Sequence, residues 1–240
     1  MHRTLACVAT ACAMAAIAVL TPAPSVSVAA EEPHGSLVPR FDENFDQFPN
    51  GAGFDDGSVF GRWRVVFDGV EGGSGVRIDH HRLELDPAEV ALPSQTHAAL
   101  VVSRRTFAVR ALLIRSAWTT MEQHRAVRPN PWEVGWLVWD YVDPDHFTYL
   151  ALKATGWEIG RRDPSKPGGQ RFIATGSTVL TPIGTRQTAV VDRVGTQTTI
   201  RVNDQLLASF EVGGDETSGA VGMYCEDSVV DWSRFSVATS

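Results

Sequence analysis

The stretch TTIRVNDQLLASFEV, Thr198 to Val212, decides the fold of this chain. Two β-type runs flank Asn203-Asp204, a residue pair that is typical of the tight turn of a β-hairpin. Similar short runs follow one another from Phe41 to the C-terminus, including one expected strand over Val76–Leu85 that contains His80-His81. Because no window shows helical periodicity, the pattern predicts an all-β chain built from two packed antiparallel sheets.

Residues 1–30 are typical of a secretory signal peptide. A short basic start precedes an apolar run, Leu5 to Leu20, and cleavage is expected after Ala30. The run is too short for a spanning helix, so we expect a secreted chain without a membrane anchor; an uncleaved anchor is the alternative. Residues 31–40 are expected to form a flexible leader, and residues 41–240 a single β-sandwich domain.

Cysteine and charge restrict the partners of the secreted chain. Only Cys225 remains after cleavage, so no intramolecular disulfide is expected and an apolar core must hold a monomeric domain together. The chain is acidic, yet Leu100 to Arg171 carries eleven basic and seven acidic side chains. This asymmetry indicates an anionic partner, unless it reflects chance variation on solvated strand faces. Nucleic acid is a poor candidate for an acidic secreted domain, whereas an acidic polysaccharide fits.

Three segments together resemble a known architecture: FDENFDQFPNG (Phe41–Gly51), the hairpin region Thr188–Val212, and GAVGMYCEDSVVDWSRFSV (Gly219–Val237). They are similar in pattern and order to the concanavalin A-like jelly roll. Laminin-G-like modules, many carbohydrate-binding modules, family 16 glycosidases and several polysaccharide lyases share that shape. The resemblance covers nearly the whole mature chain, and it implies a jelly-roll sandwich whose concave face holds a glycan.

A candidate glycan groove lies in HFTYLALKATGWEIGRR, residues 146–162. Alternation along the strand places Tyr149 and Lys153 on one face and apolar residues on the other. Lys153 and Arg161 are expected to bind carboxylates, and Trp157 and Trp139 to stack on sugar rings. The alternative is an ordinary solvated outer face with these tryptophans in the core.

The order of polar residues is similar to that of jelly-roll alginate-type lyases, which use Arg, Gln-His and Tyr on successive strands. The resemblance implies that Arg115 and Gln123 hold a uronate, that His124 or Tyr149 removes a proton, and that Tyr149 returns one. Their Gln-x-His triplet is absent here. Size and signal also resemble the small secreted hyaluronidases of actinomycetes that act as lyases. No cofactor is expected for such catalysis.

Two alternatives to a lyase of an acidic, hyaluronan-like glycan stay open. A non-catalytic carbohydrate-binding protein needs only the groove. A glycoside hydrolase needs two carboxylates about 5–10 Å apart. Glu133 and Asp140 cannot form that pair, because residues seven apart face opposite sides of a strand.

A structural calcium ion is also expected, because jelly rolls of this type often join their first and last strands with one. Glu43 and Asp231 resemble those ligand positions, and carboxylate oxygens suit Ca²⁺. The alternative is that both are ordinary turn or cap acids.

Overall fold

The computed structural model describes residues 37–90, 95–125, 127–213 and 217–240. The expected signal peptide and residues 31–36 of the leader lie outside this part of the chain. Strands dominate the described residues, and their one helical element is a short 3-10 turn, Pro167–Gly169. No helix among them is long and apolar enough to cross a membrane.

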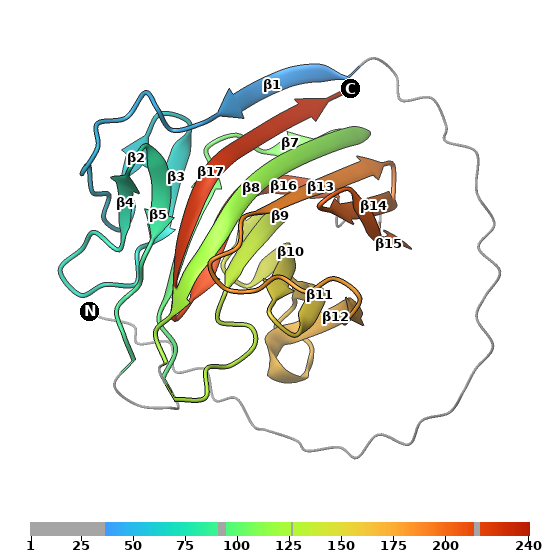
Figure 1. Cartoon of the computed structure of the whole chain (residues 1–240). Coiled ribbons are helices and arrows are strands. Elements are labelled where there is room, and N and C mark those ends of the chain that lie inside the picture. Colours follow the sequence, from blue (N-terminus) through green and yellow to red (C-terminus); the bar gives the residue numbers. More distant parts are fainter. Residues whose placement is uncertain (1–36, 91–94, 126, 214–216) are drawn as a thin grey trace.

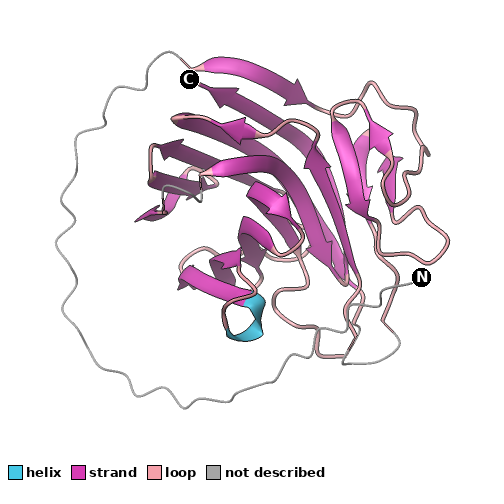
Figure 2. Cartoon of the chain, turned by 180° about the vertical axis from the view of Figure 1, so that it is seen from behind, coloured by secondary structure: helices cyan, strands magenta, loops and turns pink. Residues whose placement is uncertain are grey.

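The strands form two antiparallel sheets that pack face to face, as Figures 1 and 2 show. The smaller sheet has the order β15-β14-β13-β8-β17-β5-β4, with β1 also paired to β17. Its strands are β1 (Val38–Glu43), β4 (Val76–Asp79), β5 (Arg82–Leu85), β8 (Ala111–Gln123), β13 (Gln187–Val194), β14 (Gln197–Val202), β15 (Gln205–Glu211) and β17 (Ser228–Thr239).

The larger sheet has the order β12-β11-β10-β9-β16-β6-β3-β2, with β7 also paired to β16. Its strands are β2 (Val59–Phe60), β3 (Trp63–Phe67), β6 (Ala98–Ser103), β7 (Phe107–Ala108), β9 (Gly135–Asp143), β10 (His146–Lys153), β11 (Gly156–Arg162), β12 (Gln170–Gly176) and β16 (Ser218–Glu226). The predicted all-β, two-sheet jelly roll is confirmed.

Two hairpins show how turn residues set the strand boundaries. Asn203 and Asp204 join β14 to β15 with φ of 48° and 66°, the left-handed pair that a tight hairpin turn requires. His80 and His81 adopt the same geometry, with φ of 45° and 58°, between β4 and β5. The prediction of one strand through these histidines was therefore wrong, because Asp79 pairs back onto Arg82 across a two-residue turn.

Large aromatic side chains fill the space between the sheets. Trp118 and Trp232, from the adjacent strands β8 and β17, stack with ring centroids 4.8 Å apart. Trp63 packs edge-on against Phe235 at 5.3 Å. Cys225 is a free thiol buried in this core, where burial raises its pKa. Apolar packing between the two sheets therefore stabilises the sandwich.

The chain ends of the domain lie side by side in the smaller sheet (Figure 1). Val38 pairs with Thr239 and Pro39 with Ala238, so β1 is an edge strand that pairs with the last residues of β17. The expected leader of residues 31–40 is thus wrong for Val38, Pro39 and Arg40, which belong to this strand. Backbone pairing with the last strand, rather than a loose tether, holds them.

Candidate functional site

An unusual apolar cluster covers the face of the larger sheet that points away from the smaller one. Alternate residues of β9, β10 and β16 supply its aromatic members, and it is separate from the core between the sheets. A sheet face outside the sandwich normally carries polar side chains. We call this surface the aromatic face; it comprises Trp136, Phe147, Tyr149, Lys153, Glu158, Arg162, Gln170, Tyr224 and Glu226.

Strand register brings these residues into rows. Ala151 on β10 pairs with Glu158 on β11 and with Trp136 on β9, and Trp136 pairs with Tyr224 on β16. Directly opposite residues of neighbouring strands point to the same side of a sheet. Glu158, Ala151, Trp136 and Tyr224 therefore form one row, with roughly 14 Å between its ends at about 4.8 Å per strand.

Trp136 is the centre of the aromatic face. Its ring stacks on Tyr149 with centroids 4.4 Å apart and contacts Tyr224 at 4.9 Å. Its Nε1 donates to the carbonyl of Trp132 at 2.9 Å, which holds that half-exposed residue beside the face. Gly160 opposite Tyr149 leaves the room required, because a Cβ there would lie 2.5 Å from the Tyr149 Cζ.

A hydrogen-bonded polar group lies on one side of Trp136. The Tyr149 hydroxyl lies 2.8 Å from Glu158 Oε1 and 2.8 Å from Gln170 Oε1. Lys153 Nζ donates to the other Glu158 oxygen at 3.0 Å. Burial and the neighbouring carboxylate raise the pKa of Tyr149, so its hydroxyl keeps its proton. Side chains of Lys153 and Glu158 retain 16% and 12% exposure, which leaves their outer atoms accessible to a ligand.

A second tyrosine–glutamate pair lies on the other side of Trp136. The Tyr224 hydroxyl donates to Glu226 Oε1 in a short hydrogen bond. Burial raises the pKa of Glu226 to about 7, although this hydrogen bond and the Arg162 charge oppose the shift. The aromatic face therefore presents two carboxylates in different electrostatic environments, each held by a tyrosine.

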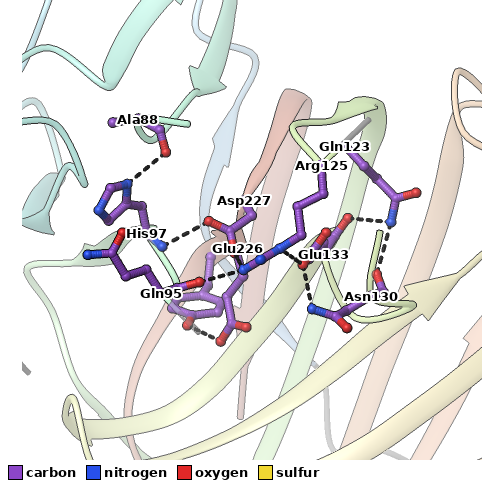
Figure 3. Close-up of polar contacts among 10 residues, drawn as sticks. Ala88, Gln95, His97, Gln123, Arg125, Asn130, Glu133, Glu226 and Asp227 are labelled. Atoms are coloured by element: carbon purple, nitrogen blue, oxygen red, sulfur yellow. Dashed lines mark hydrogen bonds and ion pairs between the residues drawn. The ribbon is translucent and has the colours of Figure 1, made fainter. Parts of the chain in front are cut away.

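Beside the second pair, a buried ionic cluster ties three loops together (Figure 3). Arg125 forms ion pairs with Glu133, which is fully buried, and with Asp227, at 2.9 Å in the latter case. Its guanidinium also donates to the carbonyl of Gln95 at 2.5 Å. Since Asp227 follows Glu226 and Glu133 precedes β9, this cluster positions one end of the aromatic face.

The expected sugar platforms lie on the wrong side of the sheet. Trp157 and Trp139 are buried in the core between the sheets, with 6% and 0% exposure, so neither ring can stack on a ligand. Arg161 shares their side and donates to Thr148 Oγ1 at 3.0 Å. The predicted alternation within β11 was correct. The prediction was wrong in placing Trp157 and Arg161 on the face of Tyr149, because Glu158 and Arg162 lie on that face.

The residues that resemble a lyase site do not meet. Arg115 is exposed on the outer face of the smaller sheet, opposite to Ile114 in the core, whereas Tyr149 lies on the outer face of the larger sheet. Gln123 donates to the backbone carbonyls of Asn130 and Glu133 at 3.1 and 3.0 Å. Its role is thus to hold the loop between β8 and β9.

His124 belongs to a separate pair at the end of β8. Its Nε2 lies 3.2 Å from Asp86 Oδ1, and this hydrogen bond raises the pKa of the imidazole and lowers that of the carboxyl. His124 Nδ1 has no hydrogen-bond partner among the described residues. Nothing in this contact connects the imidazole to Tyr149.

The expected calcium ligands are engaged elsewhere. Glu43 accepts hydrogen bonds from the Phe45 amide and from Gln47, and Asp231 pairs with Arg82 at 3.3 Å. Glu43 pairs with Phe235 on β17, and Phe235 lies four positions along that strand from Asp231. No group of three or more His, Cys, Asp or Glu residues suited to a metal occurs within the described ranges. Glu43 and Asp231 therefore do not come together as the expected pair of calcium ligands.

Sequence reasoning did not find Glu158, Arg162, Gln170, Tyr224 and Glu226. A signal was available for two of them. If the turn between β10 and β11 is placed at Ala154-Thr155, Lys153 pairs with Gly156, and Glu158 and Arg162 then join Tyr149 on one face. The other three lie on strands whose order the sequence does not state.

Comparison with known proteins gives similarity of structure only. No family model and no curated protein sequence matches the chain. Among solved structures, the carbohydrate recognition domain of Emp47p has a TM-score of 0.57 at 9% identity, covering 85% of this chain and 97% of that one.

The exoplasmic/lumenal domain of VIP36 gives similar values. Its metal-free form has a TM-score of 0.57 at 10% identity, covering 85% of this chain and 94% of that one. Its Ca²⁺/Man2-bound form has a TM-score of 0.51 at 10% identity, covering 75% and 81%. At such low identity these matches show that the chain has the jelly-roll sandwich of lectin-like domains.

Proposed function

We propose that this chain is a secreted, non-catalytic carbohydrate-binding protein that holds a glycan on the aromatic face. The observation that carries the proposal is the stacked Trp136 and its two tyrosines, each of which orients a partly buried glutamate. Fixed carboxylate, amide and ammonium groups suit the hydroxyl groups of a sugar. The lectin-like neighbours with this fold support the same function.

The buried rings and the exposed groups have different tasks in this proposal. Tyr149 and Trp136 are almost fully buried, so they fix the positions of polar atoms rather than cover a sugar ring. Trp132, at 40% exposure, supplies an accessible aromatic surface beside Trp136. Glu158 lies two strand spacings from Trp136, roughly 10 Å, a span that accommodates two neighbouring sugar units.

The chemical class of the glycan is a second part of the proposal. Lys153 was expected to bind a flanking carboxylate, but its ammonium is neutralised by Glu158, and Arg162 lies 3.5 Å from Asp145. These pairs favour recognition through hydroxyl groups over recognition through acidic groups. β-Elimination is not proposed, because Arg115, His124 and Tyr149 lie on different parts of the sandwich.

Isothermal titration of the purified chain with neutral and acidic oligosaccharides tests this function. Glu158→Gln and Trp132→Ala are each expected to weaken binding by about tenfold or more, because each removes one direct contact. Arg115→Ala, on the outer face of the other sheet, serves as the control and should bind like the wild type. Unsaturated uronate appearing in hyaluronan or alginate digests, or a loss of binding in the control alone, would contradict the proposal.

A further inference from the structure

A second polar site lies away from the aromatic face, in a pocket of about 440 Å³. It is formed where β1, the turn between β2 and β3, and the end of β6 with the residues that follow it come together. Half of its lining residues are arginines, and none is acidic; the lining residues are Arg40, Phe41, Gln47, Gly61, Arg62, Ser103, Arg104 and Arg105. Such a concentration of positive charge in a chain of net charge −7 requires a physical explanation.

Neighbouring groups hold the guanidinium groups in place. Arg62 lies over the ring of Phe41 at 4.9 Å, and Arg105 lies over the ring of Phe107 at 5.6 Å. Arg40 Nε donates to a threonine hydroxyl of β17 at 2.6 Å. These cation–π and hydrogen-bond contacts reduce the rotamer freedom of the arginines before any ligand arrives.

The pocket holds more positive charge than its surroundings neutralise. Arg62 lies 3.4 Å from Glu43, whose oxygens also accept hydrogen bonds from Gln47. Within the part of the chain that the structure describes, Arg40, Arg104 and Arg105 have no carboxylate in ion-pair range. Arg104 instead contacts a carbonyl, that of Gly61, at 3.4 Å. Guanidinium groups held close together without counter-charges favour the binding of an anion.

We propose that this arginine pocket binds an oxyanion of the sulfate or phosphate type. Its place in the fold makes it independent of the aromatic face. Ala98 at one end of β6 pairs with Glu226, whereas Ser103 at the other end lines the pocket. The five intervening steps along the strand separate the two sites by roughly 17 Å, so one site can fail while the other binds.

Calorimetric titration of the full chain with sodium sulfate and with sodium phosphate tests the proposal, at ionic strength held constant with sodium chloride. Saturable binding of either anion is expected, and the tighter of the two indicates whether sulfate or phosphate groups are the natural source. The double variant Arg104→Ala/Arg105→Ala should weaken binding by about tenfold or more, because it removes two charged donors.

A control variant distinguishes a specific anion site from a general effect of positive charge on anion binding. Arg115→Ala/Arg201→Ala removes the same charge from exposed positions of the smaller sheet and should leave anion binding unchanged. The four arginines replaced in the two double variants are solvent-exposed, so both variants should unfold at the same urea concentration as the wild type. A urea denaturation curve checks this. No saturable binding, equal competition by chloride, or equal losses in both double variants would overturn the proposal.

Discussion

Replacement of Arg125 by alanine should destabilise the domain more than the loss of any surface ion pair. The side chain is 11% exposed and bridges Glu133 and Asp227, which are 0% and 1% exposed. Its removal leaves two buried carboxylates without a counter-charge. Breaking a buried pair from one side costs about 3–5 kcal/mol. For a domain of this size, that loss lowers the melting temperature by roughly 6–20 °C.

Urea denaturation followed by tryptophan fluorescence measures this effect, with Arg234→Ala as the matched control. Arg234 pairs with Asp42, but both side chains are more than half exposed, so its loss should cost less than about 1 kcal/mol. Burial already raises the pKa of Glu133, and removing Arg125 should raise it further. A carboxyl whose pKa is raised by folding stabilises the fold at low pH and loses that contribution as pH rises.

The deficit of Arg125→Ala relative to the wild type should consequently be larger at pH 8 than at pH 5. Equal stabilities of the Arg125 and Arg234 variants at pH 7, or a deficit that grows as pH falls, would refute the reasoning.

Three further predictions concern the core, the aromatic face and the pH dependence of stability. Trp139→Ala should lower the free energy of unfolding by about 3–5 kcal/mol because it empties a core position, whereas Trp132→Ala should change it by less than about 0.5 kcal/mol; urea curves compare the two. Gly160→Ala should cost about 1–3 kcal/mol and weaken glycan binding, since the added methyl group must displace the tyrosine ring beneath it; calorimetry on both properties checks this. Burial raises the pKa of Glu84 and of Glu226 to about 7, so the free energy of unfolding of the wild type should fall as pH rises from 5 to 8. In a Glu84→Gln/Glu226→Gln variant the free energy of unfolding should change less over this pH range. An equal pH dependence in the wild type and the variant would contradict the role given to these two carboxyls.

The sequence predicts the sandwich well because its signals are local. The Asn203-Asp204 turn and the alternation along β10 and β11 depend only on neighbouring residues, and the structure confirms both. The turn at His80-His81 was missed, since histidine is less typical of left-handed turns than glycine or asparagine.

Much of the site depends on strand register and strand order, which a local sequence pattern does not determine. Whether Trp157 or Glu158 shares a face with Tyr149 depends on the register of one turn, and a shift of one residue reverses the answer. Tyr224 and Tyr149 lie on the same face near one another only because β16 and β10 both pair with β9. Arg125 meets Asp227 across 102 residues of sequence, which no local pattern indicates.

The aromatic face as a glycan site is tested most directly by amide chemical shifts, recorded by NMR during titration with the tightest-binding oligosaccharide. The largest shifts should fall at Trp132, Lys153, Glu158 and Glu226, while Arg115 and Arg201 on the smaller sheet stay unchanged. Shifts confined to the outer face of the smaller sheet, with none at Lys153 or Glu158, would contradict the account.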